Sequence, residues 1–369
     1  MAFFLDDDHR ESADRRRIRV GWTLLFVAIL GVTALAWVPS PYVIQQPGAT
    51  FDTLGEVTID EEQVVLIEVP GETVYDTEGS LTLLTVGIVG SRSTPVPWLD
   101  VVRAWFDQSK AVIPVDVAYP QGQTVEQSNE ENQALMRQSQ QAATAAALRE
   151  LGYEVPTNII IRKIVPDSPA EGQLQPEDVI VSANGEPVAD AAALQNLVKE
   201  NGAGQEISFG YLRAGVESQV ALTPAAGFAP DPIIGVSFET VYEFPFEVHI
   251  QLEDVGGPSA GMMFALGIID KLTPGAMTGG ESIAGTGTVA DDGTVGPIGG
   301  IRQKLYGADY SGAAWFLAPE RNCDEVVGHV PEGLSVFSVA TLDDAIAAVE
   351  AIASGDTAGL ATCEAGGSA

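Results

Sequence analysis

The residues best suited to chemistry in this chain are a serine between small residues and a lysine 45 positions later. Ser259 lies in residues 257–261, GPSAG, where it adds little to packing, so we expect its hydroxyl to meet a reactant. A hydroxyl becomes a nucleophile at neutral pH only with a base, and a desolvated lysine loses its proton readily enough to be one. Ser259 and Lys304 are therefore candidates for a Ser-Lys dyad, a variant of the serine, histidine and aspartate arrangement.

A second enzyme class fits the same serine. The GxSxG pattern at 257–261 is also found in α/β-hydrolases, which need a later acid followed by a histidine. His329 is the only histidine after Ser259. An esterase that uses His329 is thus the alternative enzyme, and it predicts that His329→Ala is inactive while Lys304→Ala is not.

The elements expected around both residues place them near helix starts. A strand, a glycine-bearing turn and a helix over 261–270 put Ser259 beside free N–H groups and a helix dipole, which stabilise an oxyanion. Gly257 lets a substrate approach the backbone, and Ser259 supplies the N–H that its proline neighbour lacks. A helix over 300–310 follows a glycine-rich run and carries Lys304, whose pKa burial would lower.

Periodicity divides the rest of the chain into regions. Alternating strand-like and helix-like runs predict an α/β domain over 231–353, followed by a tail, 354–369. Short strands between turn signals predict a β-rich module over 153–225. Residues 39–152 contain further strands and a long alanine-rich helix over 129–151.

The N-terminal region predicts a membrane anchor. Residues 20–38 carry no charge, and as a helix they span about 28 Å against a hydrocarbon core of roughly 30 Å. Four arginines between residues 15 and 19 keep the segment 1–19 in the cytoplasm by the positive-inside rule. The remainder would then lie outside the cytoplasmic membrane. A cleavable signal peptide is the alternative, since Ala-Leu-Ala at 34–36 fits a cleavage pattern.

Composition limits the partners and cofactors. The formal charge of −33, from 18 basic and 51 acidic residues, argues against nucleic acid. The three histidines are scattered and the cysteine spacing fits no metal motif, so we expect no metal. Outside the cytosol, Cys323 and Cys363 either form a disulfide that closes a 40-residue loop or stay as free thiols.

The β-rich module resembles bacterial PDZ domains. The resemblance rests on IVPDSPA at 164–170, LQPEDVI at 174–180 and ANGEPV at 183–188, with Glu177 where the family has glycine. It implies a groove between a strand and a helix that accepts a peptide as an added strand. A spacer without a ligand is the alternative.

The C-terminal region resembles the proteolytic domain of Lon proteases, and most closely that of single-pass, PDZ-bearing Lon-like proteins of bacteria. The matching motifs are GPSAGM at 257–262, LT at 272–273, TGG at 278–280, IAGTG at 283–287 and GTVGPIGGI at 293–301, followed by Lys304. The resemblance implies a serine endopeptidase without a cofactor, in which Ser259 attacks a peptide carbonyl and Lys304 takes and later returns the proton. It also implies a homo-oligomer, since Lon proteolytic domains form six-membered rings.

Two departures from the Lon pattern concern the support of the dyad. Gly256 stands where Lon proteases often have an acid, and Ala-Gly-Thr at 284–286 stands where they have TGE. Thr286 and Thr288 are the candidates for a hydroxyl that supports Lys304. The early strands and part of 129–151 faintly resemble the start of the Lon fold, which predicts that the PDZ module is an insertion in the protease domain.

The expected fold is therefore an α/β (α+β) Lon-type proteolytic domain with a PDZ-like β-rich module, preceded by one transmembrane helix. No GxxxxGK[ST] motif occurs, so we expect ATP-independent cleavage of unfolded or flexible exported or membrane protein segments. The alternative is a PDZ peptide-binding adaptor on a Lon-like scaffold with little or no activity.

Overall fold

The computed structural model describes residues 7–363 except 60–61, 121, 123, 189–190, 227–230 and 253–254. The chain divides into two compact units. Unit 1 comprises Met1–Ala147 and Val248–Ala369, and unit 2 comprises Leu148–Glu247. Unit 2 is therefore inserted into the chain of unit 1, and each unit is described by itself.

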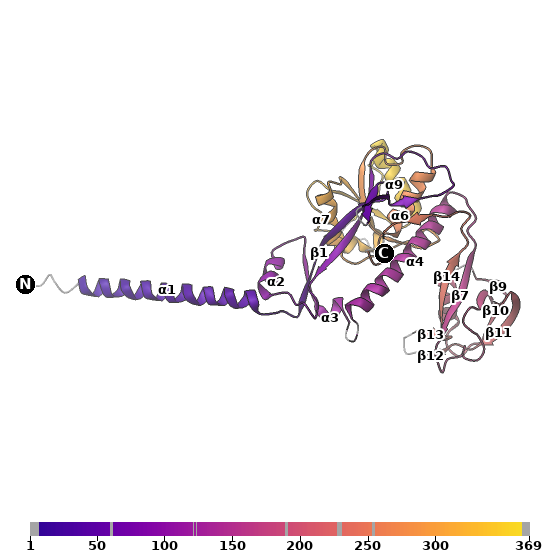
Figure 1. Ribbon diagram of the computed structural model, residues 1–369, viewed down its shortest axis with the longest axis horizontal. Coiled ribbons are helices and arrows are strands. Elements are labelled where there is room, and N and C mark those ends of the chain that lie inside the picture. Colours follow the sequence, from indigo (N-terminus) through magenta and orange to yellow (C-terminus); the bar gives the residue numbers. More distant parts are fainter. Residues whose placement is uncertain are drawn as a thin grey trace, which may run out of the picture. The chain divides into compact units, whose positions relative to one another are not determined.

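Unit 1 begins with a single long helix, α1, at Asp7–Trp37 (Figure 1). Its stretch Arg19–Trp37 is long and apolar enough to cross a membrane by length and composition. The side chains of that stretch pack against little of the protein. An apolar helix that the protein hardly buries is weak evidence for a membrane anchor, because a signal sequence has the same length and composition.

A six-stranded mixed sheet forms the centre of unit 1. Its strand order is β20 (Ser335–Val339), β19 (Trp315–Pro319), β16 (Ser282–Gly285), β5 (Ser80–Val89), β1 (Tyr42–Asp52), β6 (Ala111–Pro114). Strands β5, β16, β19 and β20 run parallel, and β1 is antiparallel to both of its neighbours. Leu81 of β5 lies opposite Ile283 of β16. Strands that precede unit 2 in the sequence and strands that follow it therefore form one sheet.

Helices cover both faces of this sheet. Strand residues alternate between the faces, and Ala284 and Phe316 pack in one cluster with Leu305 of α7 (Ile301–Ser311). On the other face, a Cβ at Gly285 would meet Met263 of α6 (Gly261–Leu272). Helices α6 and α7 thus lie on opposite faces, and helix α9 (Leu342–Ser354) contacts α6.

Shorter elements complete unit 1. They are β2 (Glu56–Ile59), β3 (Glu62–Val65), β4 (Ile67–Glu68), α2 (Trp98–Trp105), α3 (Val115–Ala118), α4 (Val125–Glu150, which runs into unit 2), β15 (His249–Ile250), β17 (Thr288–Val289), β18 (Val295–Gly296), η1 (Glu320–Asn322) and α8 (Cys323–Val326).

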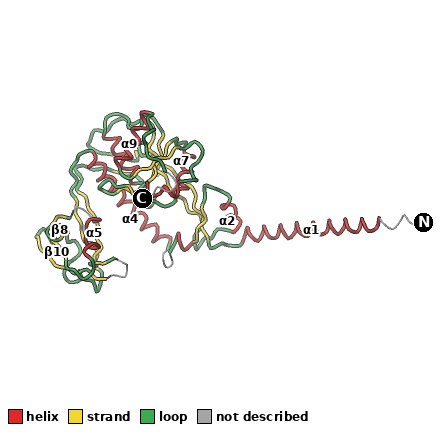
Figure 2. Tube along the Cα trace, turned by 180° about the vertical axis from the view of Figure 1, so that it is seen from behind, coloured by secondary structure: helices red, strands yellow, loops and turns green. Residues whose placement is uncertain are grey.

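Unit 2 is a β-rich domain (Figure 2). Its main sheet has the order β11 (Val216–Leu222), β10 (Ile207–Arg213), β8 (Val179–Ala183), β7 (Thr157–Ile164), β14 (Val236–Tyr242). The remaining elements are β9 (Glu186–Pro187), α5 (Ala191–Asn201), β12 (Ala225–Ala226) and β13 (Pro232–Ile233). Leu194 of α5 is buried in the same core as Phe209 of β10.

The boundaries expected for the β-rich module need a correction. The expected division put 153–225 in the module and 231–353 in the α/β domain, whereas β14 belongs to unit 2. The physical reason is long-range pairing: Val236 lies opposite Ile164 of β7, and Phe238 packs against the unit 2 core. Local sequence pattern does not reveal a strand's partner.

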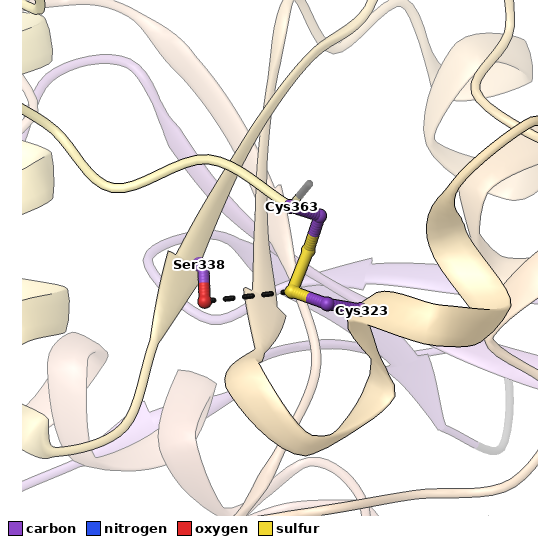
Figure 3. The surroundings of a disulfide bond; sticks show 3 residues. All are labelled: Cys323, Ser338 and Cys363. Atoms are coloured by element: carbon purple, nitrogen blue, oxygen red, sulfur yellow. Dashed lines mark hydrogen bonds between the residues drawn. A yellow bond between two sulfur atoms is a disulfide. The ribbon is translucent and has the colours of Figure 1, made fainter. Parts of the chain in front are cut away.

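The two cysteines form a disulfide in unit 1 (Figure 3). Cys323 lies at the start of α8 and Cys363 in the C-terminal segment, and the Ser338 hydroxyl lies 3.5 Å from the Cys323 sulfur. Next to this bond, the Ser338 N–H donates to the Ala361 carbonyl and Phe337 pairs with Thr362. The segment before Cys363 therefore lies along β20, the strand at one edge of the sheet.

Candidate active site

Ser259 and Lys304 meet beyond the carboxyl end of β16. Ser259 stands just before α6 and Lys304 lies in α7, so the two side chains come from opposite faces of the sheet. Lys304 Nζ is 2.8 Å from Ser259 Oγ and 2.8 Å from Thr286 Oγ1. The Thr286 hydroxyl donates to the Ser259 carbonyl at 2.9 Å, so its lone pairs face the Lys304 nitrogen.

Burial sets the charge of Lys304. Its side chain is 2 % exposed, and this desolvation lowers the pKa of Lys304 to about 7. The ammonium form loses its hydration here, while its two partners are neutral hydroxyls that return little of that energy. A substantial fraction of Lys304 is therefore a neutral amine at pH 7, which is the form that accepts a proton.

The start of α7 requires glycine. Gly300 has φ +72°, in the left-handed region, and a Cβ there would lie 2.8 Å from Val86 Cγ2. A larger residue would be strained by its backbone and would push β5 away from the helix. This close approach of helix and strand places Lys304 in the interior.

Asn322 fixes the loop that leads to α7, and the sequence pattern did not single it out. Its side chain is 2 % exposed, accepts from the Ile298 N–H and donates to the Ile298 carbonyl, both at 2.9 Å. A buried amide that meets both backbone groups of one residue holds that residue in a single position. The Asn322 amide thus fixes the chain two residues before Gly300.

Helix α4 holds the serine loop from outside, a second contribution that sequence did not reveal. The Ser139 hydroxyl donates to the Pro258 carbonyl at 2.9 Å, and the Gly257 N–H donates to the Asn132 carbonyl at 2.8 Å. The Gly257 N–H is therefore already bonded within the protein, and Gly257 stays a candidate only for the close approach of a substrate to the backbone. The Ser259 N–H donates to no backbone carbonyl within the described part of the chain.

A cleft of about 440 Å³ opens onto both residues. Its lining is largely apolar and consists of Ala49, Phe51, Leu83, Leu84, Thr85, Val86, Met136, Val255, Gly256, Ser259, Ala260, Gly299 and Lys304. Strand β16 ends at Gly285, opposite Leu83 of β5. Beyond that point β16 no longer pairs with β5, and the next residues of β5 border the cleft on that side. An extended chain can lie along such a strand.

Other candidate residues lie elsewhere. Thr288 is in β17, and the two side-chain partners of Lys304 are Ser259 and Thr286. His329 Nδ1 lies 3.1 Å from the Val327 carbonyl, and His329 is not part of the cleft lining. The structure therefore brings Lys304, and not His329, to the serine. No metal-binding group of three or more His, Cys, Asp or Glu occurs among the described residues.

Two family models match the chain. Residues 122–223 match the PDZ domain, and residues 240–352 match the Lon protease (S16) C-terminal proteolytic domain. The PDZ match ends before β14, although that strand pairs with β7. The chain thus combines a PDZ domain with the proteolytic domain of a class of serine proteases.

Curated relatives agree with the second match. Lon protease 1 of Sorangium cellulosum (strain So ce56) is 32 % identical over 134 residues, which is 35 % of this chain and 16 % of that protein. Lon protease 1 of Bacillus subtilis (strain 168) is 28 % identical over 118 residues, 30 % of this chain and 15 % of that protein. The chain therefore spans only about a sixth of the length of these relatives.

Among solved structures, the PDZ domain of an SdrC-like protein from Listeria monocytogenes is similar to part of this chain. It covers 22 % of this chain and 85 % of its own, with 16 % identity and a TM-score of 0.21. At that score the likeness carries no weight beyond the family match.

Proposed function

We propose that this protein is a membrane-anchored serine endopeptidase with a Ser259–Lys304 dyad. The observation that carries the proposal is the 2.8 Å distance between Lys304 Nζ and Ser259 Oγ, with the lysine buried and its pKa lowered to about 7. A nucleophile within hydrogen-bond reach of a base that is partly neutral at working pH has the geometry of covalent catalysis.

The chemical steps follow from the positions of the atoms. Neutral Lys304 accepts the hydroxyl proton as Ser259 Oγ bonds to the peptide carbonyl carbon, and the carbonyl electron pair moves to its oxygen. The Ser259 N–H at the start of α6 is the donor proposed for that oxygen. As the oxyanion collapses, the peptide C–N bond breaks and the Lys304 ammonium protonates the leaving amine. Water, activated by the same lysine, then attacks the serine ester, and the acyl group leaves as a carboxylic acid while Ser259 regains its proton.

The cleft supports a proposal for the substrate class. An apolar cleft bordered by the exposed side of β5 accepts an extended segment more easily than a folded domain. We therefore propose unfolded or flexible segments of exported or membrane proteins as substrates. The chain carries no P-loop motif, and we propose that this cleavage requires no ATP. With α1 as the anchor and its arginines inside, cleavage takes place outside the cytoplasmic membrane.

The test is hydrolysis of casein, a flexible protein, by the full chain in detergent or a bilayer, with and without ATP. Ser259→Ala and Lys304→Ala should abolish hydrolysis, whereas Arg302→Ala, an exposed residue of the same helix, should leave it unchanged. Equal rates in all variants would overturn the dyad and favour the adaptor alternative. A rate that requires ATP would overturn ATP independence alone.

Unit 2 supports a peptide-binding role. A groove of about 420 Å³ lies between α5 and residues 231–238, next to β14, the last strand of its sheet. A peptide added to the outer edge of β14 would gain backbone hydrogen bonds there. We propose that this groove binds polypeptide tails, and that the chain assembles as a homo-oligomer, such as the six-membered ring of Lon domains. Peptide titration and the mass of the purified chain test these two proposals.

A further inference from the structure

Large apolar side chains are exposed where α1 enters the folded part of unit 1. At the end of α2, Trp105 is 59 % exposed and Phe106 is 85 % exposed. Val117 of α3 is 67 % exposed, and Trp37 at the end of α1 is 83 % exposed. We call Trp105, Phe106 and Val117 the collar. Such a group in a folded domain indicates a surface that meets something other than water.

Backbone contacts fix the start of α2, the helix that ends at Trp105, beside the end of α1. The Trp98 N–H donates to the Val38 carbonyl at 3.1 Å, and the Ser40 N–H donates to the Val96 carbonyl at 2.8 Å. The first residue of α2 is therefore bonded to the residue that follows α1, and the two helices are in contact (Figure 1).

The inner face of α2 is firmly packed. Val101 is fully buried and Ala104 is 3 % exposed, in a cluster with Ile44 of β1. The Trp98 ring packs edge-on against Trp105, with ring centroids 6.5 Å apart. One face of the helix is held by this core, and Trp105 and Phe106 lie outside it.

The third collar residue is held at the same end by α3. The Val115 N–H donates to the Pro41 carbonyl at 2.9 Å. The Arg92 guanidinium donates to Asp116 and to the Tyr119 carbonyl, which ties the loop before α2 to α3. The start of α3 is thus hydrogen-bonded to Pro41, four residues after the end of α1.

Local charge also distinguishes this region. Arg92, Arg103 and Lys110 lie close to the collar in sequence, whereas the chain as a whole has a formal charge of −33. Asp100 and Asp107 pair with Arg103 and Lys110, so the segment is nearly neutral. A neutral surface with exposed aromatic side chains suits the headgroup region of a bilayer, which strongly acidic surfaces avoid.

We propose that the collar is a second membrane contact, with Trp105, Phe106 and Val117 inserted into the interface beside α1. This inference rests on the proposed membrane anchor. The occupant is a lipid bilayer because the surface is continuous with the end of the apolar span Arg19–Trp37. Insertion at a second point would limit the swing of the catalytic unit about the end of its anchor.

The test measures the depth of single labels in the full chain reconstituted into bilayers. Phe106→Cys is labelled with an environment-sensitive thiol dye, and quenching by lipids brominated along their acyl chains is recorded. The native cysteines are joined in a disulfide and stay unlabelled without reductant. Val117→Cys reports independently from α3, in case one variant fails to fold.

Two controls separate this inference from the anchor. Val330→Cys labels a 40 % exposed apolar residue just before β20, at the opposite edge of the sheet from β6. Leu30→Cys labels the middle of the apolar span. We expect strong quenching at positions 30, 106 and 117 and none at 330.

Each other outcome is decisive. Quenching at 30 without quenching at 106 and 117 would overturn the collar and leave the anchor. No quenching at 30 would overturn the anchor and the collar with it. A dye at 106 that shifts to the blue without quenching by brominated lipid would mean that protein, and not lipid, covers this surface, which also overturns the proposal.

Discussion

Two lysines of unit 1 are buried, and their surroundings differ. Lys304 is 2 % exposed and lies beside two hydroxyl oxygens. Lys271, at the end of α6, is 7 % exposed, donates to the Leu54 carbonyl at 3.3 Å and is influenced by the carboxylates of Asp52 and Asp270.

The carboxylates make the difference in chemistry. Burial lowers the pKa of Lys271, but Asp52 and Asp270 oppose that shift because they stabilise the ammonium. Among the described residues no carboxylate opposes it at Lys304, whose pKa falls to about 7. Burial next to acids thus lowers the pKa of Lys271 against their opposition, whereas burial next to hydroxyls lowers the pKa of Lys304 to about 7.

The largest expected effect comes from replacing Lys304 with a basic side chain that cannot lose its proton. Lys304→Arg keeps a long basic side chain at the position, but a guanidinium does not lose its proton at working pH. We expect casein hydrolysis to fall by roughly 10³-fold or more, as for loss of a triad member. Hydrolysis at the wild-type rate would contradict a role of Lys304 as base. Lys271→Arg is the matched control, and in folded protein it should leave the rate unchanged.

The pH profile tests the lowered pKa of Lys304. Only the neutral amine accepts the serine proton, so activity should fall about tenfold per pH unit below the pKa of about 7 and level off above it. Hydrolysis of a short uncharged peptide between about pH 5.5 and pH 9 measures this. A rate that still rises tenfold per pH unit at pH 9 would show that Lys304 keeps the ordinary pKa of a lysine.

Unfolding of the variants Lys304→Met and Lys271→Met tests how the burial of each lysine affects stability. The unfolded chain keeps Lys304 protonated up to its ordinary pKa of 10.5, whereas the folded chain releases the proton near 7. Between these values the unfolded state binds more protons, so this residue makes stability rise with pH. Lys304→Met should therefore be more stable than wild type at pH 7, with an advantage that shrinks toward pH 10.

Lys271→Met should have the opposite sign. Asp270 is fully buried, and burial raises its pKa while Lys271 opposes that rise, so removal of the lysine leaves the acid less compensated. We expect a loss of about 1–3 kcal/mol in the free energy of unfolding at pH 7, measured in denaturant. If both Lys304→Met and Lys271→Met stabilise the protein, burial of the ammonium destabilises the fold at both positions and the nearby acids do not compensate for it at Lys271.

The smallest effect concerns Asn322, which acts through the loop before α7. Asn322→Asp keeps the acceptor for the Ile298 N–H but loses the donor to the Ile298 carbonyl. We expect kcat to fall by roughly tenfold with little change in KM, because a displaced loop misplaces the base more than the substrate. A steady-state comparison of kcat and KM on the short peptide measures this.

The control for this variant is the neighbouring residue Glu325, whose carboxylate accepts from the Asn322 amide at 3.4 Å. Glu325→Gln keeps an acceptor oxygen at that position and leaves both bonds to Ile298 in place, so it should keep the wild-type kcat. A change in KM alone in Asn322→Asp would contradict a positioning role.

Parts of the fold and site followed from sequence because their signals are local. Small residues around Ser259 and the helix after it are a short pattern, and the glycine run before Lys304 signals a tight approach. The hold of Asn132 and Ser139 on the serine loop was not predictable, since these residues lie more than a hundred positions away on α4. The same limit hid β14, whose partner β7 lies in another part of the chain.

By itself, the sequence determined which residues have the chemistry: a serine at a helix start, a lysine 45 residues later and an apolar span before both. Tertiary structure decided that the lysine lies beside the serine with a lowered pKa. Its pKa depends on how completely α7 and the sheet exclude water and on its having hydroxyls as side-chain partners, and both depend on packing between distant segments. The sequence specifies the type of each side chain, but its exposure to solvent is a property of the folded chain.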